Sequence, residues 1–371
     1  MAALLAVGLA APAGCGADEP APDGSSLSGT GQPPSGGPTD TLPSPGSSAS
    51  GDPAVPGTLP TGFAPDAAIG ISLPAGDSWQ RAADALSQGL VNVGLTPAIA
   101  AASGASAQVE QIGDLVNQGV SVIIAAPVAV EAETALADAR AAGAYVIAYV
   151  TPVADPGAAD LFIGYDPLEV GTLQANALLT GLASSGDRPS PWTLELVPGP
   201  AGRPGAEPWL DGVWGGLAAE FAAGSLEFPG GEGYREAVAG GSPPLAKDGK
   251  RPAGLIAADD ELLGAALDAL ASRSGPTPVA VGAGWDAAGA QRVAAGEQYA
   301  TIALDPAAAA ESTLGAIQAI QNGARPSASG DLQGVPATYV PPVAVTADNI
   351  CEVFAADPDL AKSLQTHPAC Q

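Results

Sequence analysis

Two pairs of side chains that could hold a small molecule stand at the ends of apolar segments. Trp285 and Asp286 follow VAVGAG, and Asp259 and Asp260 follow GLIAA. A flat aromatic ring stacks on the C–H face of a pyranose or another polyol, and a carboxylate accepts hydrogen bonds from its hydroxyl groups. These pairs therefore predict the recognition of a solute that carries hydroxyl groups.

Further aromatic and polar side chains follow other apolar segments in the same way. They are Asp77 with Trp79, Thr151, Tyr165 with Asp166, and Glu207 with Trp209. Each tryptophan taken singly could instead pack in a core or at its rim. Because several of the five tryptophans stand at such ends in a chain with only 4% aromatic residues, we favour a ligand site.

The cysteines are consistent with an exported protein. Cys351 and Cys370 lie near the C-terminus, and an oxidising exterior permits a disulfide between them. His367 stands close to Cys370, so a Cys/His/Cys metal site is the alternative, although it would lack a fourth ligand. We expect the disulfide, and neither a metal nor a cofactor.

The N-terminal segment predicts export. MAALLAVGLAAPAGC is apolar and ends in small residues before Cys15, so it resembles a bacterial lipoprotein signal (residues 1–15) whose cysteine receives the lipid. An ordinary apolar leader with a chance cysteine is the alternative. No Lys or Arg precedes Arg81, so we expect translation to start upstream of this Met. A spanning helix needs about 20 apolar residues, and we expect none, so the lipid would be the only anchor to the outer face of the cytoplasmic membrane.

Residues 16–62 differ in composition from the rest of the chain. They are mainly Gly, Pro, Ser, Thr and Asp with isolated apolar residues, a composition that cannot bury enough surface to offset chain entropy. We expect a disordered linker with an end-to-end distance on the order of 40 Å. Such a linker would hold a folded body clear of a membrane.

The charge balance argues against a nucleic-acid partner. Lys and Arg number 12 against 39 Asp and Glu, for a formal net charge of -27. A surface of this sign repels nucleic-acid phosphates and anionic membranes. The hydrophobic share of 46% over 371 residues is enough to build two packed domains.

From Ala67 onward, short apolar segments alternate with amphipathic ones. AIGISL, VSVIIAAP and AYVIAYV are typical of buried strands, and WQRAADALSQGLVNVG and VEAETALADARAAG are typical of the helices between them. A second series of the same kind runs from DLFIGY to ATIALD. The alternation predicts an α/β fold of two doubly wound parallel-sheet lobes with helices on both faces of each sheet. Ligands of such sheets bind beyond the carboxyl ends of the strands, where the candidate residues stand.

The folded part of the chain resembles the type I periplasmic binding proteins, in particular the xylose- and multiple-sugar-binding proteins of ABC importers. The resemblance rests on GISLPAGDSWQRAADAL, IAADDELLGAALDAL, GWDAAGAQRVAAGEQYATIALDP and the tail PVAVTADNI. Within these, AGEQYATI and PVAVTADNI are the most specific. The resemblance implies a monomer that captures a sugar or sugar-like molecule between its lobes and delivers it to an ABC transporter permease.

The resemblance also implies where the lobes and the ligand contacts lie. Residues 63–166 with 305–330 would form lobe 1, and residues 167–304 with 331–371 would form lobe 2. The chain would cross the hinge near residues 165–167, 303–305 and 332–338. By position, the pairs Asp259–Asp260 and Trp285–Asp286, together with Trp79 and Trp209, would contact the ligand.

Three sites, one of them a pair of residues, depart from the family pattern. Val150 and Thr151 replace an Asp-Arg pair, Ser78 replaces an arginine, and Leu304 replaces a polar side chain. The guanidinium groups that grip sugar hydroxyls are therefore missing, and we expect aromatic faces and carboxylates with no facing cation. A more apolar glycoside, a polyol with a cationic group and a ligand that is not a sugar all remain open.

We predict a binding protein and not an enzyme. Gly282, Gly284 and Ala287 fit a loose dinucleotide fingerprint, but Trp285 and Asp286 fill positions that a pyrophosphate must approach. Nothing in the sequence marks one carboxylate of an Asp260/Asp286 pair as the proton donor of a glycoside hydrolase. A sensor or envelope lipoprotein on the same fold, with a non-sugar ligand or a receptor partner, is the alternative to an importer subunit.

Overall fold

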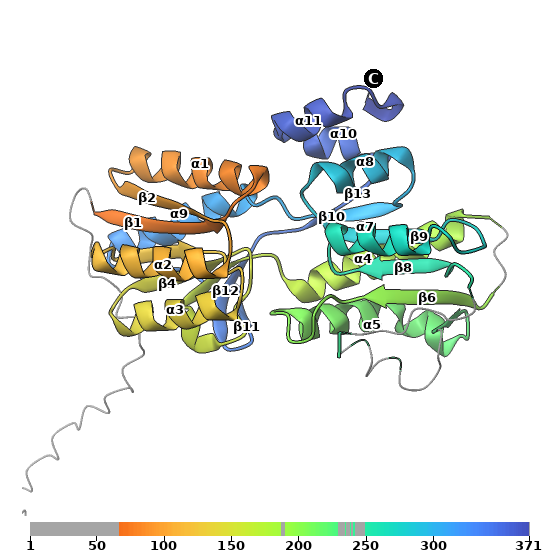
Figure 1. Ribbon diagram of the computed structural model, residues 1–371, viewed down its shortest axis with the longest axis horizontal. Coiled ribbons are helices and arrows are strands. Elements are labelled where there is room, and N and C mark those ends of the chain that lie inside the picture. The colour runs from red at the N-terminus through yellow and green to blue at the C-terminus, as the bar shows by residue number, and fades with distance from the viewer. Residues whose placement is uncertain are drawn as a thin grey trace, which may run out of the picture. The chain divides into compact units, whose positions relative to one another are not determined.

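The computed structural model describes residues 67–186, 190–228, 234, 238, 240–241 and 249–370. These residues form two β-sheets, and each sheet lies between layers of helices (Figure 1). Cys15 and the linker at 16–62 lie outside the described residues. Within the described part of the chain, no helix is both long and apolar enough to cross a membrane.

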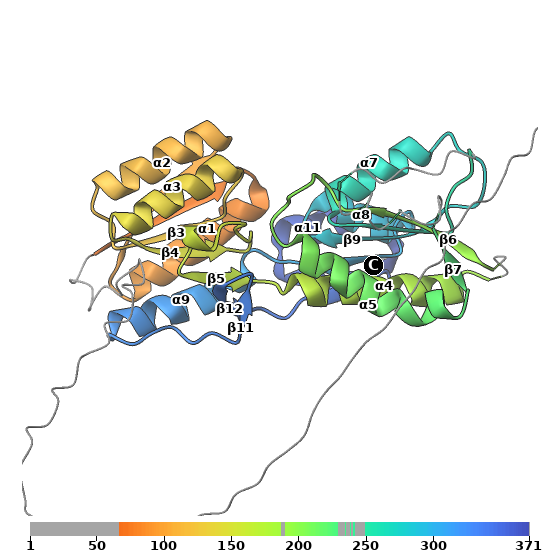
Figure 2. The same cartoon turned by 90° about the horizontal axis from the view of Figure 1, so that it is seen from below.

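The first sheet has seven strands in the order β11-β12-β5-β4-β3-β1-β2. Its strands are β1 (Ala68–Pro74), β2 (Thr96–Ala102), β3 (Val122–Ala125), β4 (Tyr145–Tyr149), β5 (Leu161–Gly164), β11 (Gly330–Leu332) and β12 (Val335–Tyr339). Neighbouring strands run parallel except β11 and β12. Helices α1 (Asp77–Asn92) and α9 (Ala308–Gln321) pack together on one face, and α2 (Ala105–Asn117) and α3 (Val130–Ala141) cover the other (Figure 2). A short 3₁₀ helix, η1 (Pro156–Ala158), precedes β5.

The apolar runs explain the central strands of this sheet. Every residue of β3 and β4 is buried, because helices cover both faces and leave no side of the strand for polar residues. Successive side chains point to opposite faces, so Ile124 and Ile147 join one core cluster while Ile123 and Val146 join the other. We call the body built on this sheet lobe 1.

The second sheet has six strands in the order β13-β10-β9-β8-β6-β7. Its strands are β6 (Trp192–Val197), β7 (Leu226–Glu227), β8 (Gly254–Ala257), β9 (Val279–Gly284), β10 (Ala300–Ala303) and β13 (Val343–Thr346). Only β13 runs antiparallel to its neighbour. Helices α4 (Pro167–Ser184) and α5 (Ala206–Ala222) cover one face, and α7 (Asp260–Leu270) and α8 (Ala287–Ala295) cover the other (Figure 2). This body is lobe 2.

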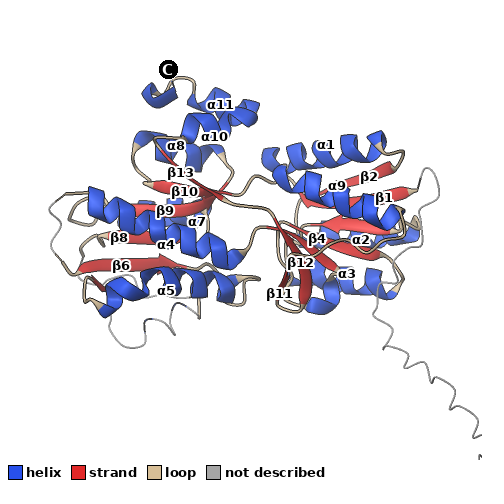
Figure 3. Cartoon of the chain, turned by 180° about the vertical axis from the view of Figure 1, so that it is seen from behind, coloured by secondary structure: helices blue, strands red, loops and turns tan. Residues whose placement is uncertain are grey.

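A C-terminal segment packs on α8 of lobe 2 (Figure 3). It comprises α10 (Ile350–Val353), η2 (Phe354–Ala356), α11 (Pro358–Leu364) and η3 (Pro368–Cys370). Cys351 and Cys370 form a disulfide that joins the two ends of the segment. Trp285, Phe354 and Leu360 belong to one buried cluster, so this segment reaches the end of β9 where a ligand residue was predicted.

The two-lobed parallel-sheet fold is the one that the sequence predicted, and the chain passes between the sheets three times. The passages lie between β5 and α4, between β10 and α9, and between β12 and β13.

The third passage differs from the expected position at 332–338. Residues Ala337–Tyr339 pair with β5, so the chain leaves lobe 1 only after Tyr339, and residues 331–339 belong to lobe 1 instead of lobe 2. A position between β11 and β5 gives the backbone of this short strand hydrogen-bond partners on both sides.

Both lobes repeat one strand order in their parallel part. The order is β2-β1-β3-β4-β5 in lobe 1 and β7-β6-β8-β9-β10 in lobe 2. In each lobe the order reverses next to the first strand, which is the kind of place where doubly wound sheets bind ligands at their carboxyl ends. The candidate residues are therefore assessed at these strand ends.

Candidate ligand site at the strand ends

Trp285 follows β9 and packs against the C-terminal segment. Its side chain is only 8% exposed, its Nε1 donates a hydrogen bond of 2.9 Å to Oδ2 of Asp357, and its ring meets Phe354 edge-on at 4.8 Å between centroids. The guanidinium of Arg81 lies 5.7 Å from the centre of the indole ring. A cation at this distance is attracted to the face of an aromatic ring, so one of the indole faces predicted to meet a ligand is covered by Arg81.

Arg81 links α1 of lobe 1 to two carboxylates. Its Nη2 lies 3.1 Å from Oδ1 of Asp305 and 2.9 Å from Oδ2 of Asp357. Asp305 stands on the passage between β10 and α9, and Asp357 stands on the C-terminal segment of lobe 2. The expectation of no facing cation is therefore wrong, because a guanidinium reaches this site from a helix position that the sequence reasoning did not consider.

Asp260 serves the fold of lobe 2 in this structure, in place of the ligand contact that the sequence predicted. It is 2% exposed, and its two carboxylate oxygens accept hydrogen bonds of 2.7 Å from Nε2 of Gln298 and Oγ1 of Thr301. Burial raises the pKa of this carboxyl to about 6, against the lowering effect of its two hydrogen bonds. Both carboxylate oxygens of Asp260 are thus engaged within lobe 2.

Three other predicted carboxylates cap the helices that follow their strands. Asp166 accepts a hydrogen bond of 3.0 Å from the backbone N–H of Leu168, Asp259 one of 2.8 Å from Leu262, and Asp286 one of 2.8 Å from Gly289. A carboxylate at an N-cap satisfies an orphan donor and complements the helix dipole. Asp286 is exposed and the other two are half-buried, so all three line the strand-end edge with negative charge.

A second cation stands beside Asp259. Nη2 of Arg203 lies 3.8 Å from Oδ2 of Asp259, and both side chains are about one-third exposed, at 35% and 36%. This long, exposed pair contributes little to stability. It places a donor and an acceptor side by side at the strand ends of lobe 2.

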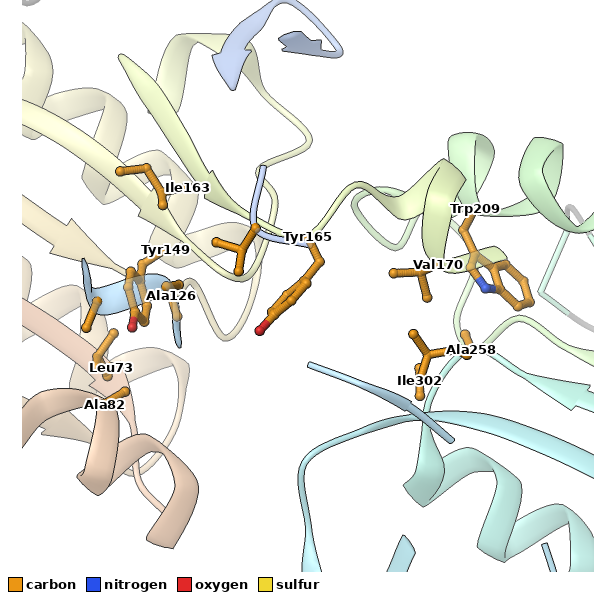
Figure 4. Packing of buried hydrophobic residues seen from close by; sticks show 14 of the residues in the cluster. Leu73, Ala82, Ala126, Tyr149, Ile163, Tyr165, Val170, Trp209, Ala258 and Ile302 are labelled. Atoms are coloured by element: carbon orange, nitrogen blue, oxygen red, sulfur yellow. The ribbon is translucent and has the colours of Figure 1, made fainter. Parts of the chain in front are cut away.

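Two tyrosines connect lobe 1 to the passage after β10. Tyr165 donates from its hydroxyl to the backbone oxygen of Asp305 at 2.9 Å, and Tyr149 donates to the backbone oxygen of Pro306. Burial raises the pKa of both hydroxyls, so they stay protonated donors. Figure 4 shows Tyr165 on the connection between the strand of Ile163 and the helix of Val170. The predicted residue Tyr165 therefore holds the hinge through its hydroxyl.

The remaining predicted residues occupy varied surroundings. Trp79 on α1 is half-buried and packs against Tyr149, with 6.5 Å between ring centroids. Trp209 on α5 is 3% exposed, and its Nε1 donates to Oε1 of Gln174 at 2.5 Å. Thr151 is half-buried just after β4, and Glu207 is exposed in the first turn of α5. Asp77 is the first residue of α1, and its side chain is not among those described.

A small cavity lies among these residues. Its volume is about 90 Å³, and it is lined by residues that follow β4 and β5 of lobe 1, by residues of α4 and α5 and of the segments before α5 and after β8 in lobe 2, and by the passage after β10. Tyr165 and Trp209 are two of its lining residues, and Val150, Arg203 and Leu304 are others. The sequence reasoning missed Arg81, Arg203 and Tyr149. Their only signal was proximity in sequence, since Arg81 and Tyr149 stand two residues from Trp79 and Thr151, and Arg203 stands four residues before Glu207.

The described residues contain no group of three or more His, Cys, Asp or Glu side chains placed to hold a metal ion. The two cysteines of the alternative metal site are joined to each other in the disulfide.

Residues 65–325 match the model of a family described as the periplasmic binding protein domain. This chain belongs to that family. The match covers more than half of the chain and includes most of both lobes. Membership makes this periplasmic binding protein an extracytoplasmic binder and not an enzyme, as the sequence predicted.

Two curated relatives resemble this periplasmic binding protein over most of its length. The multiple sugar-binding periplasmic receptor ChvE of Rhizobium radiobacter is 26% identical over 281 residues, which are 67% of this chain and 77% of the receptor. The D-xylose-binding periplasmic protein of Escherichia coli (strain K12) is 25% identical over 293 residues, which are 76% of this chain and 86% of that protein.

Solved structures share its fold. An ABC transporter solute binding protein from Clostridium phytofermentans with bound β-D-glucose superimposes with a TM-score of 0.67 at 22% identity, over 79% of this chain and 99% of that one. A carbohydrate transporter solute binding protein from Chloroflexus aurantiacus in complex with D-glucose gives 0.64 at 24% identity, over 79% and 96%. These likenesses establish the architecture of both lobes.

Proposed function

We propose that this periplasmic binding protein captures a sugar or polyol at the strand ends of its two lobes and delivers it to an ABC transporter permease. The observation that carries the proposal is the resemblance of most of the two-lobed body to two relatives that are both named as sugar-binding proteins. The site chemistry supports it. Trp79 is partly accessible, and Asp166, Asp259 and Asp286 offer acceptors for hydroxyl groups.

A titration of the purified chain with sugars and polyols tests this proposal. D-glucose, D-xylose, D-ribose, glycerol and myo-inositol would be added while tryptophan fluorescence and the thermal midpoint are followed. One solute should give a saturable change in fluorescence and a raised midpoint, because a ligand that binds only the folded state stabilises it. Asp286→Asn should weaken the binding of that solute. The exposed Glu227, at the end of the two-residue edge strand β7, makes Glu227→Gln a matched control. The absence of any response to this panel and to alkyl glycosides of its sugars would refute sugar binding.

Delivery to a permease is tested by uptake in cells. A strain that lacks this protein should lose uptake of the solute that binds, and the wild-type chain should restore it. If the strain keeps full uptake but loses a transcriptional response to the solute, the protein is a sensor component on the same fold.

We also propose that Cys15 carries a lipid that anchors the protein to the outer face of the cytoplasmic membrane. The support is the apolar segment with small residues directly before this cysteine. Cells grown with a labelled fatty acid should label the wild-type chain, and Cys15→Ala should remove the label and release the protein from the membrane. Unchanged labelling of the variant would refute the anchor.

A further inference from the structure

The small cavity at the hinge is lined mainly by apolar side chains. Its apolar side chains come from both lobes and from the passage between them: Val150, Val170, Ala258 and Leu304. Three more lining residues are the prolines Pro152, Pro167 and Pro204, whose nitrogens have no hydrogen to donate. Figure 4 shows Val170, Ala258 and Trp209 together on the lobe 2 side, with Tyr165 on the connection to lobe 1.

The polar atoms of its two aromatic residues are engaged elsewhere. The hydroxyl of Tyr165 donates to the backbone oxygen of Asp305 at 2.9 Å, and Nε1 of Trp209 donates to Oε1 of Gln174 at 2.5 Å. Both residues therefore offer the cavity their ring carbons. A ligand hydroxyl placed here would lose its hydrogen bonds to water and find few replacements, which is unfavourable.

The backbone of Val150 points to the same site independently. Its φ is 61°, and the backbone N–H of Thr151 bonds to the oxygen of Tyr149 at 2.6 Å, the pattern of a tight γ-turn. This region is unfavourable for a β-branched residue, and backbone strain of this kind gathers at functional sites. The valine thus brings an apolar side chain to the cavity at a position where Gly would relax the backbone.

The rim of the cavity is polar. Arg203 lines it, and its guanidinium lies 3.8 Å from the carboxylate of Asp259. A donor and an acceptor here suit the hydroxyl groups of a ligand whose apolar part fills the cavity. A volume of about 90 Å³ has room for a small alkyl group, since about 10–15 Å³ of such space already holds one water molecule.

We infer that the ligand of this protein is a sugar or polyol that carries a small apolar substituent, and that the hinge cavity receives this substituent. This inference rests on the proposed function and adds the substrate class to it. Val150 and Leu304 cannot form hydrogen bonds with a sugar through their side chains. They can instead pack against the apolar substituent of the ligand.

A series of glycosides tests the inference on the purified chain. Dissociation constants would be measured by calorimetry for D-glucose, D-xylose, their methyl, ethyl and propyl β-glycosides, and 1-propanol. Each added carbon should tighten binding about fourfold, the effect of burying one methylene group, and the gain should level off once the alkyl group fills the cavity.

The outcomes separate the two proposals. If a free sugar binds and its propyl glycoside binds no tighter, the substrate class is wrong and the proposed function stands. If 1-propanol binds as tightly as the propyl glycosides, the cavity is apolar as inferred but sugar binding is refuted. If neither sugars nor glycosides bind, both proposals are refuted. A propyl glycoside that binds more tightly than its free sugar supports both.

Two glycine variants at positions of positive φ locate the effect. Val150→Gly removes the apolar side chain, and Gly accepts a positive φ without strain, so the protein should remain folded while the gain from ethyl to propyl falls to less than twofold. Gln333→Gly is the control, because Gln333 has a φ of 52° in the turn between β11 and β12 and does not line the cavity. This control should bind the glycosides as the wild type does. An unchanged alkyl gain in Val150→Gly would overturn the inference.

Discussion

At the residue scale, two adjacent aspartates take different roles. Asp259 caps α7 at the surface, whereas Asp260, one residue on, turns into lobe 2 and meets Gln298 and Thr301. Successive helical positions differ by about 100° in direction, so the next residue faces the core. The carboxyl group of Asp260 therefore lies in the interior of lobe 2, where burial disfavours its charged form.

The raised pKa of Asp260 makes a pH-dependent contribution to stability. The pKa rises from 3.8 to about 6 in the folded protein, mainly through burial, so the folded state holds this proton more tightly than the unfolded state. The contribution is therefore most favourable below about pH 4 and is lost as the pH rises through about 6, by roughly 3 kcal/mol in full.

Asp260→Asn should remove this dependence. Its oxygen can accept from Gln298 and its amide can donate to the hydroxyl oxygen of Thr301, so both contacts of the buried side chain remain. Denaturant unfolding at pH 7 should give the variant about 1–3 kcal/mol more stability than the wild type, and the two should coincide near pH 4. A variant that is less stable at pH 7 would show that the buried charge is favourable.

At the element scale, the packing of α4 on α5 depends on glycine. A Cβ on Gly171 would overlap the backbone oxygen of Trp209, and a Cβ on Gly212 would overlap the backbone oxygen of Leu168. These obstacles are backbone atoms, which cannot swing aside as a flexible side chain can. The same close contact sets the position of Trp209, which lines the hinge cavity.

Gly212→Ala should therefore lower the free energy of unfolding by about 1–3 kcal/mol, the usual cost of overpacking. Gly215 is the matched control on the same helix, because a Cβ there meets nothing within 4 Å. Gly215→Ala should raise the free energy of unfolding by up to about 1 kcal/mol through helix propensity. Chemical denaturation of both variants checks the prediction, and equal effects of the two substitutions would contradict it.

At the scale of the whole molecule, Arg81 joins the lobes by charge. It contacts Asp357 of the C-terminal segment and covers the ring of Trp285. A movement of one lobe relative to the other must change these contacts. The equilibrium between lobe arrangements, which a ligand shifts by its differential affinity, therefore includes the free energy of this contact.

Arg81→Ala should expose the indole of Trp285. Acrylamide should quench the tryptophan fluorescence of this variant more strongly than that of the wild type, and the difference should vanish in a Trp285→Phe background. Stability should fall by about 1–3 kcal/mol, because the buried carboxylate of Asp357 loses a charged partner. Lys362→Ala removes an exposed cation from the same segment and should change neither property. Equal quenching with and without Arg81 would show that the guanidinium does not cover the ring.

The sequence by itself determined the parts of this protein that depend on local pattern. Apolar runs such as β3 and β4, and the amphipathic segments between them, specify a two-lobed α/β fold, because burial on both faces of a parallel sheet requires continuous apolar strands. Residues at the strand ends were also recognisable from the sequence, although it predicted ligand contacts for Asp166, Asp259 and Asp286 and not the helix N-caps that they form.

Only the tertiary structure decided what those residues touch. Trp285 has the same residue type as Trp79, but its indole contacts Arg81 and Asp357. Asp260 has the same residue type as Asp259, but its carboxylate is buried against Gln298 and Thr301. The third passage between lobes also depended on a pairing of β12 with β5. Partners such as these are distant along the chain. Local periodicity reports which side of an element is buried, whereas the identity of the group opposite follows from the packing of the whole chain.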